Sequence, residues 1–494
     1  MFHVYLIILL YAIFRATRGV IRTKRSFSWI IHNSRSLESK VTNKKESKIY
    51  ILIPVLREQE IIEDTFNNFT KLNGNYKVIF ITTKREETDR ITNLRTLKKI
   101  KNKLLYANNK QSFIYLSNGI FPKSLALSLY GKKWKEIVSA FNKLPNTKTL
   151  LKSLIDSSSK KIKSRVSIYD YPKTIGNMSD QLNFALRKLL KTEDLQNTYV
   201  CIYNADSIVS RDFPLYVKNF VNKNPKAEVI QQSALFLSNF TELGSNISGS
   251  LLKAVALLQS RWTLAHEMPR IFNQLRSISE GAHIVGHGLI IKLSVIKRVG
   301  YFPTSYVNED LPFGYILKLN GYNIYPFPQL ENAQSPTSIK SMFTQYTTWF
   351  YGAFHYPKYM LNAFREYPNK RVQAFVWGTK YSIRSIFWLG LSLTWLFIFI
   401  YPLFIGNVFL FAIALLVFIV YSPFCFYMIE KELNKNNKKI FGTNVFKELI
   451  ITPATYFMSI PAYLTHSFGP VKATIETFKS LLFRSEIKKM KTER

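Results

Sequence analysis

Two short acidic motifs, well separated in the sequence, are the parts of this chain best suited to chemistry. An Asn-Ala-Asp motif at 204–206 follows the apolar run 199–202, which predicts a buried strand and places Asp206 just past its carboxyl edge. An Asn-Glu-Asp motif at 308–310 precedes the apolar residues 311–313, which predicts a helix whose first turn favours a carboxylate. Taken singly, each motif also fits a common turn or a plain helix cap.

Each motif suggests a different role. A hard cation such as Mg²⁺ or Mn²⁺ takes oxygen ligands, and it needs only one or two protein carboxylates beside the phosphates of a nucleotide. Asp206, with the neutral amide of Asn204 beside it, therefore suits a metal-diphosphate site. A carboxylate at the start of the second helix could accept a proton from a hydroxyl nucleophile.

The order of the segments around the two acidic motifs matches that of a known protein family. From about residue 48 to residue 352 the chain resembles the membrane-bound family 2 glycosyltransferases, which are related to polysaccharide synthases. No block is specific alone, but five follow one another in the family's order. The blocks are residues 49–58, 176–183, 204–206, 286–310 and 345–349.

The resemblance implies both the fold and the roles of individual residues. The implied fold class is α/β: a GT-A nucleotide-sugar-binding domain with a mixed sheet, followed by C-terminal transmembrane helices. In the family's pattern Asp310 is the general base, Glu309 orients it or its substrate, and Asp206 and Asn204 hold the metal. The implied donor-binding residues are Pro54, Glu58, Thr82, Asn183, Asn204 and Asp206, and those of the acceptor or sugar pocket are His287, Gln345 and Trp349.

Several positions depart from the family's pattern. Asn204 replaces the first carboxylate of the metal motif, Met178 stands where a lysine falls, and Thr348 stands where an arginine falls. The second strand, 77–81, ends in threonines where an aspartate is expected. Either neighbours such as Lys173 supply the missing positive charge, or the donor differs, or catalysis is weak.

Two histidines, His283 and His287, have a spacing that binds zinc when the residues are helical. Residues 284–286 and 289–291, however, read as a strand containing a glycine, and ligands at this spacing do not converge on a strand. We therefore expect no zinc site there. His287 is placed by the resemblance in the floor of the sugar pocket.

Composition favours a membrane enzyme. The 494 residues are 47% hydrophobic and carry a formal charge of +37, which attracts anionic lipid and phosphate-bearing ligands or reflects a biased composition. The basic residues are dispersed and no groove-reading motif accompanies them, so we expect no nucleic-acid partner. The two cysteines form no disulfide framework, which suits a catalytic domain facing the cytosol.

Residues 386–428 contain no charge and predict two transmembrane helices, 386–405 and 408–428, with both flanks cytoplasmic by the positive-inside rule. Residues 449–468 could form a third span or a re-entrant segment, because Pro453 and Pro461 interrupt them. The basic tail 469–494 favours the re-entrant form and a cytoplasmic C-terminus.

The remaining boundaries follow from composition. Residues 1–25 predict an N-terminal membrane anchor or an interfacial helix, and 353–385 an interfacial segment. Within the transferase domain, 48–352, the lysine-rich stretch 85–165 predicts a helical elaboration.

The sequence thus predicts an inverting glycosyltransferase in a cell membrane, crossing it several times, with its catalytic domain cytoplasmic. It would use Mg²⁺ or Mn²⁺ and move a sugar from a nucleotide-diphosphate donor to a lipid-linked or saccharide acceptor, in polysaccharide or glycolipid synthesis. Two alternatives remain: a processive polysaccharide synthase, and a catalytically silent membrane scaffold with the same fold.

Overall fold

The computed structural model describes residues 1–38, 47–117, 120–277, 280–281 and 283–483. Its centre is a seven-stranded mixed sheet in the order β3-β2-β1-β4-β7-β5-β8, in which β7 runs antiparallel to both its neighbours. A smaller sheet pairs β6 with β9. The strands are β1 (Lys48–Pro54), β2 (Lys77–Thr83), β3 (Val166–Tyr171), β4 (Thr198–Ile202), β5 (Val229–Gln231), β6 (Ala234–Leu235), β7 (Leu289–Lys292), β8 (Ile324–Pro326) and β9 (Glu331–Asn332).

Strand β1 shows why this sheet forms. Its alternate residues Ile49, Ile51 and Ile53 pack with α2 (Ile62–Thr70) and α11 (Phe213–Lys223), whereas Tyr50 and Leu52 pack with α10 (Met178–Thr192) on the opposite face. Both faces are therefore buried, which explains a continuous apolar run in place of an alternating one. Because β1, β2 and β4 are parallel, their carboxyl ends meet at one edge of the sheet.

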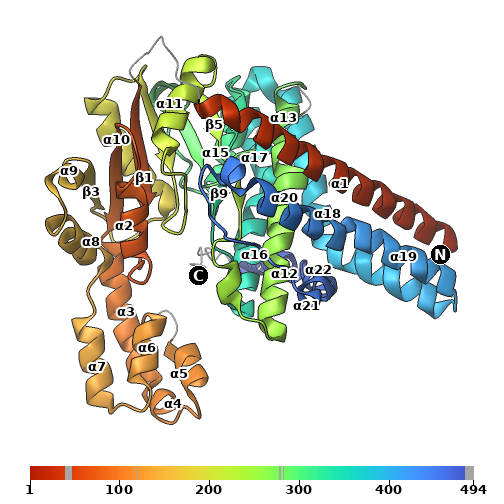
Figure 1. Ribbon diagram of the computed structural model, residues 1–494, viewed down its shortest axis with the longest axis horizontal. Coiled ribbons are helices and arrows are strands. Elements are labelled where there is room, and N and C mark those ends of the chain that lie inside the picture. Colours follow the sequence, from red (N-terminus) through yellow and green to blue (C-terminus); the bar gives the residue numbers. More distant parts are fainter. Residues whose placement is uncertain (39–46, 118–119, 278–279, 282, 484–494) are drawn as a thin grey trace.

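A helical lobe fills the long connection between β2 and β3, as the composition predicts. It lies below the sheet in Figure 1, and its helices α3 to α7 enclose an apolar cluster of their own around Phe113 and Phe141. The lobe and the helices that follow it are α3 (Arg85–Lys99), α4 (Lys101–Leu105), α5 (Lys110–Ser117), α6 (Lys123–Leu129), α7 (Trp134–Lys143), α8 (Thr147–Asp156) and α9 (Lys160–Lys163).

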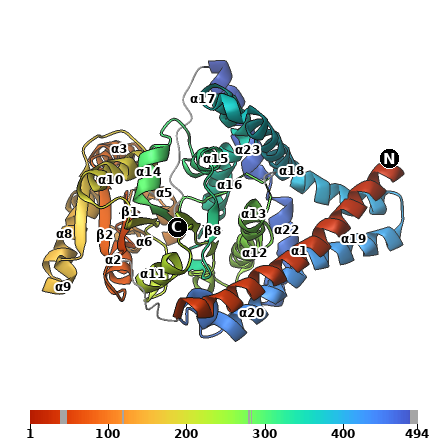
Figure 2. The same ribbon diagram turned by 90° about the horizontal axis from the view of Figure 1, so that it is seen from above.

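Three helical segments within the described residues are long and apolar enough to cross a membrane: Phe2–Glu38, Pro368–Phe404 and Val408–Phe441. They comprise α1 (Phe2–Glu38), α18 (Arg371–Phe404), α19 (Val408–Tyr421) and α20 (Pro423–Phe441). Figure 2 shows α1, α18 and α19 projecting together from the rest of the molecule, and α1 contacts α18, α19 and α20.

The expected boundaries change in three places. The N-terminal helix runs past residue 25 because its buried stripe continues through Phe27, Ile30 and Leu37. Residues 353–385 are helical throughout most of their length, since α17 (Tyr356–Glu366) leads into α18 without an intervening loop domain. In place of helices at 386–405 and 408–428, α18 begins at Arg371 and α19 ends at Tyr421, with α20 following from Pro423. The turn between α18 and α19 lies where Asn407 caps α19.

The segment 449–468 is not a single helix of spanning length. It holds two short helices, α21 (Pro453–Phe457) and α22 (Ser459–Leu464), and α23 (Phe468–Phe483) follows. A proline supplies no backbone donor, so Pro453 begins a helix and does not continue one. A re-entrant path remains a prediction, and the basic residues at 484–494 lie outside the described residues.

The remaining helices connect the sheet to the membrane helices. Residues 263–267 form a π-helix, η2 (Thr263–Glu267), between two α-helices, a feature often found at functional sites. The set is η1 (Phe240–Leu243), α12 (Ile247–Trp262), η2, α13 (Met268–Gln274), α14 (Leu293–Val299), α15 (Asp310–Leu319), α16 (Ile339–Phe354) and η3 (Pro368–Lys370).

Candidate active site

Asp206 lies in a turn directly after β4, as the sequence predicts. The turn is closed by two hydrogen bonds between residues 204 and 207: the Ser207 amide donates to the Asn204 carbonyl, and the Asn204 amide donates to the Ser207 hydroxyl, each at 3.2 Å. From α2, the Thr65 hydroxyl donates to the Ala205 carbonyl at 2.6 Å. Asp206 is buried, with 8% of its surface exposed, so the turn fixes one carboxylate at the edge of the sheet.

The second motif opens α15. Oδ1 of Asp310 accepts a 2.8 Å hydrogen bond from the Leu311 amide, which orients the carboxyl group. The side-chain amide of Asn308 donates to the Thr348 carbonyl at 3.0 Å and so ties this motif to α16. Gly286 lies against the acidic pair, because a methyl group placed on it would be 3.7 Å from both Oδ2 of Asp310 and Oε1 of Glu309.

His287 follows Gly286 in the sequence and contacts a buried carboxylate. Its Nδ1 lies 3.0 Å from Oε2 of Glu331, whose side chain is fully buried on β9. Burial alone would lower the pKa of His287, but the Glu331 carboxylate, together with Glu267 and Asp310, outweighs burial and raises it. The positively charged form of the imidazole is therefore favoured near Asp310 and Glu267.

Glu267 is a further carboxylate that the sequence motifs do not reveal. It ends the π-helix η2, is 3% exposed and lines the same cavity as Asp310. Burial raises the pKa of Glu267 to about 7, although a hydrogen bond from Ser233 and the charge of His287 oppose the shift. Its side chain thus titrates near neutral pH, which is unusual for a carboxyl group.

A cavity of about 1790 Å³ brings most of the predicted residues together. It extends from the loop after β1, past the two acidic motifs, to the membrane helices α1 and α18. The predicted site residues that line it are Pro54, Glu58, Asn204, Asp206, His287, Glu309, Asp310 and Trp349.

Three predicted residues make other contacts and do not line this cavity. Thr82 donates its hydroxyl to Asp170 at 2.9 Å, and Asn183 exchanges two hydrogen bonds with the backbone of Phe302. Gln345 accepts from the side-chain amide of Gln259 at 2.7 Å. These three residues hold the walls of the site in place, and any direct contact with substrate remains a prediction.

Two arginines line the cavity, and both also pair with Asp89, at 3.6 Å for Arg57 and 3.8 Å for Arg85. Arg85 lines the cavity and donates to the Gly176 carbonyl at 2.8 Å, next to the position where Met178 replaces a lysine. Arg57 lines it too, and its φ of 58° is the one positive value among the described residues other than glycine. Lys173 is exposed and lies outside the lining. Arg57 and Arg85 are therefore better placed than Lys173 to meet a phosphate group.

The possible metal ligands Asp206 and Asn204 fit a cation that is also coordinated by substrate oxygens and water. Within the described residues, no group of three or more histidine, cysteine or acidic side chains is placed to hold a metal ion. Asp206 and Asn204 offer one carboxylate and one amide oxygen at the cavity wall. That pair suits Mg²⁺ or Mn²⁺ completed by diphosphate oxygens and water, and it does not suit a structural zinc site.

Comparison with known families decides the assignment. Residues 199–428, a little under half of the chain, match the model of glycosyl transferase family group 2, and the match includes both acidic motifs. Residues 199–428 therefore carry the sequence pattern of a family 2 glycosyltransferase. The chain's mixed sheet with flanking helices is the GT-A arrangement expected for this transferase, and helices long and apolar enough to cross a membrane follow the sheet. No curated protein sequence matches the transferase.

Two solved structures resemble the transferase at low identity. One is the mannosyltransferase PcManGT from Pyrobaculum calidifontis in complex with GDP-Man and Mn²⁺, with 11% identity and a TM-score of 0.37, covering 94% of this chain and 99% of that one. The other is TarS from S. aureus, with 14% identity and a TM-score of 0.30, covering 63% of this chain and 39% of that one. Both TM-scores are low, so the assignment rests on the family match.

Proposed function

We propose that the transferase moves a sugar, with inversion, from a nucleotide-diphosphate donor to an acceptor hydroxyl at the cytoplasmic face of a membrane. The observation that carries this proposal is that Asp206 and Asp310, which come from separate elements, line one cavity. A direct displacement needs the base and the departing diphosphate on opposite sides of the anomeric carbon. Two separated carboxylate sites meet that requirement, and a single cluster would not.

In this proposal, metal binding, proton transfer and charge balance are carried out by different residues. Asp206 and Asn204 would hold Mg²⁺ or Mn²⁺, which when bound offsets the charge of the departing diphosphate. Asp310 accepts the acceptor's proton, with its Oδ1 already held by the Leu311 amide and Oδ2 on the Gly286 side. Glu331 raises the pKa of His287, and the protonated imidazole offsets part of the negative charge around Asp310 and Glu309.

Donor binding gives the direct test. A panel of nucleotide sugars is added with Mn²⁺ to the detergent-purified protein, and the donor is identified as the one that raises the melting temperature. That donor should then be hydrolysed or transferred only with added Mg²⁺ or Mn²⁺, and the anomeric configuration of the product should be inverted. A silent scaffold would bind donor without turnover, and a retained configuration would exclude the single displacement.

A processive synthase is the second candidate, because the cavity continues along α18 past Leu391 and Trp395. A processive enzyme would release long chains while most acceptor stays unused, whereas a single-transfer enzyme would convert acceptor evenly to one product. Product length at low acceptor conversion therefore separates the two.

Sidedness is tested by thiol labelling. In a protein in which Cys201 and Cys425 are replaced by serine, a cysteine is placed at Tyr115 in the helical lobe, at Lys479 on α23 or at Val408 at the turn between α18 and α19; all three positions are exposed. We expect a membrane-impermeant reagent to label only Val408→Cys in intact cells. Labelling of Lys479→Cys in intact cells would place the C-terminal helix outside.

A further inference from the structure

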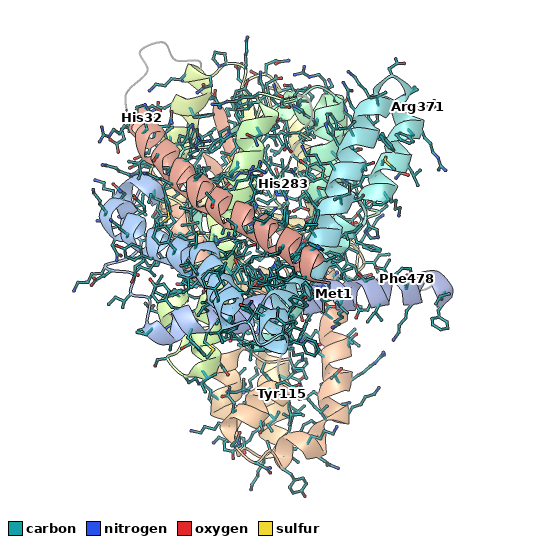
Figure 3. The ribbon with its side chains drawn as sticks, turned by 90° about the vertical axis from the view of Figure 1, so that its right-hand side faces the viewer. Met1, His32, Tyr115, His283, Arg371 and Phe478 are labelled. Carbon is teal, nitrogen blue, oxygen red and sulfur yellow. The ribbon has the colours of Figure 1, made fainter. Side chains whose placement is uncertain are left out.

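The cavity has a second, strongly basic region beside the membrane helices. We call it the arginine region. It comprises Arg15, Arg18 and Arg22 of α1, Arg261 of α12, Arg270 of α13, and Lys380 and Arg384 of α18, all of which line the cavity. In Figure 3, α1 runs diagonally across the molecule from Met1 to beyond His32, and it contacts both η2 and α13. The region therefore joins four helices that are distant in sequence.

Positive charge in this region greatly exceeds negative charge. Glu280 pairs with Lys380 at 2.9 Å and with Arg384 at 3.2 Å. Within the described residues, no carboxylate lies within 4.0 Å of the other five arginines of the region. Grouping like charges at a wall of low dielectric is costly unless an anion offsets them.

Arg261 shows this imbalance most clearly. It is 2% exposed, its Nη1 donates to the Tyr463 hydroxyl at 3.3 Å, and its Nε and Nη2 have no hydrogen-bond partner. Its guanidinium reaches the backbone of α1 at Gly19, where an added methyl group would lie 2.7 Å from Nη2. The guanidinium carbon also lies 4.1 Å from the centre of the Tyr421 ring, but this contact uses neither N–H group. Both groups can therefore donate to a ligand that brings an acceptor oxygen.

The same arginines also lower the pKa values of two neighbouring histidines. Burial, together with Arg15, Arg22, Arg261 and Arg270, lowers the pKa of His266 well below its ordinary value. Burial, with Arg270 and Arg384, does the same for the pKa of His283, and neither ring nitrogen of His283 has a hydrogen-bond partner. Both imidazoles are therefore neutral at neutral pH and add no positive charge to the region.

The adjoining wall is apolar. Phe387, Leu391 and Trp395 of α18, with Tyr11 of α1, continue the lining away from the arginines, and both helices are long and apolar enough to span a membrane. A cavity that is cationic at one end of this stretch and apolar at the other suits an amphipathic ligand with an anionic head. Guanidinium groups bind phosphate oxygens in bidentate pairs, and arginine is favoured over lysine for that purpose.

We propose that the arginine region binds the phosphate or diphosphate headgroup of a membrane lipid whose apolar chain lies along α18, and that this lipid carries the sugar acceptor. The statement that this lipid carries the sugar acceptor rests on the proposed function. Binding of the lipid phosphate stands on the charges and the lining, with or without catalysis. Free inorganic phosphate shares the same chemistry, and the experiment distinguishes the two sources.

The test uses farnesyl phosphate as the probe and measures the melting temperature of the purified full-length protein without donor. Farnesol supplies the same chain without charge, and inorganic phosphate and pyrophosphate supply the charge without a chain. The test variant is Arg22→Gln, and the matched control is Arg25→Gln, because Arg25 lies on the same helix, is exposed and is outside the cavity lining. Arg270→Gln is the second test variant, in case Arg22 contributes little.

We expect farnesyl phosphate to raise the melting temperature of the native protein and of Arg25→Gln by several degrees. The shift should be lost in Arg22→Gln and in Arg270→Gln, and farnesol should produce none. An equal shift with inorganic phosphate or pyrophosphate would overturn the lipid assignment, and an undiminished shift in both arginine variants would overturn the site. Comparison of melting temperatures without ligand shows whether either variant is misfolded.

Two further measurements separate this proposal from the proposed function. Asp206→Ala should still respond to farnesyl phosphate, because its carboxylate belongs to the other motif of the cavity. Stabilisation by the donor with Mn²⁺ should remain in Arg25→Gln and in Arg22→Gln. If donor binding fails in the native protein while the farnesyl phosphate shift persists, the transferase mechanism is wrong and the lipid site stands.

Discussion

The two ends of the cavity carry opposite charges on different kinds of scaffold. The acidic end, formed by Asp206, Glu267, Glu309 and Asp310, is built at strand ends and helix starts of the transferase domain. The arginine region is built on helix faces of α1, α12, α13 and α18. The two ends meet at the junction of η2 and α13, where Glu267 and Arg270 stand three positions apart.

The difference shows how one cavity can serve two ligands. Hydrogen bonds orient the side chains of the acidic end: Asp310 accepts from the Leu311 amide, and His287 contacts Glu331. Arg261, by contrast, keeps unused donors. Rigid placement suits the transfer of a proton and a sugar, whereas spare donors suit capture of a phosphate. The predictions below act on the acidic end, and each should leave the arginine region's response to farnesyl phosphate unchanged.

The largest effect is expected from Asp206→Ala. Within the part of the chain that the structure describes, no group of three or more acidic, histidine or cysteine side chains could hold the metal instead, and Asn204 alone is neutral. Transfer should therefore become undetectable, and the donor should no longer stabilise the protein with Mn²⁺. Asp212→Ala is the control, since Asp212 lies outside the cavity and accepts from Asn73 at 2.8 Å. Thermal shift and product formation give the readouts, and retained Mn²⁺ dependence in Asp206→Ala would remove it from the metal site.

Asp310→Asn should affect the rate and spare binding. Asparagine preserves the shape and the acceptor for the Leu311 amide but cannot take a proton, so transfer should fall by about two orders of magnitude or more. Donor stabilisation with Mn²⁺ should remain, which distinguishes this variant from Asp206→Ala. Transfer at the normal rate would show that Asp310 only caps the helix and is not the base.

Local sequence predicts the scaffold of the acidic end well. Strands β1 and β4 and the start of α15 agree with prediction, because an apolar run buried on both faces leaves few alternatives. The strand predicted at 284–286 is wrong: β7 begins at Leu289, because its ladder with β4 ends there and the preceding residues turn toward Asp310. The expectation of no zinc site still follows, since the segment is not helical either.

The features of the cavity that depend on contacts between distant parts of the sequence could not be predicted from it. Glu331 has no motif of its own, and it becomes important only because β9 pairs with β6 behind His287. The arginine region depends on α1 lying against η2, although more than two hundred residues separate them in sequence. In the sequence, Arg15 and Arg22 look like the basic flank of an anchor, and only the packed structure turns them toward the cavity.

A smaller effect is expected from His287→Gln, which tests the charge balance of the acidic end. Because the pKa of His287 is raised, its charge is present at low pH and is lost as the pH rises through that raised value. Transfer should therefore decline on the alkaline side, and His287→Gln should be slower by about tenfold at neutral pH without that decline. Glu331→Gln should move the decline to lower pH, because Glu331 raises the pKa. A pH profile identical in all three proteins would contradict the pair's role.

The smallest effect concerns stability and Glu267. Its folded pKa of about 7, against an ordinary 4.5, means that the folded protein binds a proton that the unfolded chain has released. The associated stability is fully present below pH 4.5 and is lost as the pH rises through 7. Glu267→Gln cannot ionise, so relative to the native protein it should gain about 3 kcal/mol of unfolding free energy between pH 4.5 and pH 8.

The measurement is the difference in melting temperature between Glu267→Gln and the native protein at both pH values. Glu63→Gln, at an exposed position on α2, provides the control and should show no such change with pH. A difference that does not vary with pH would mean that Glu267 is ionised at neutrality, held by Ser233 and His287. An ionised Glu267 would then place a negative charge between the acidic end and the arginine region. A difference that grows with pH would instead show that Glu267 stays protonated until the pH approaches about 7, so that below this pH it adds no charge between the acidic end and the arginine region.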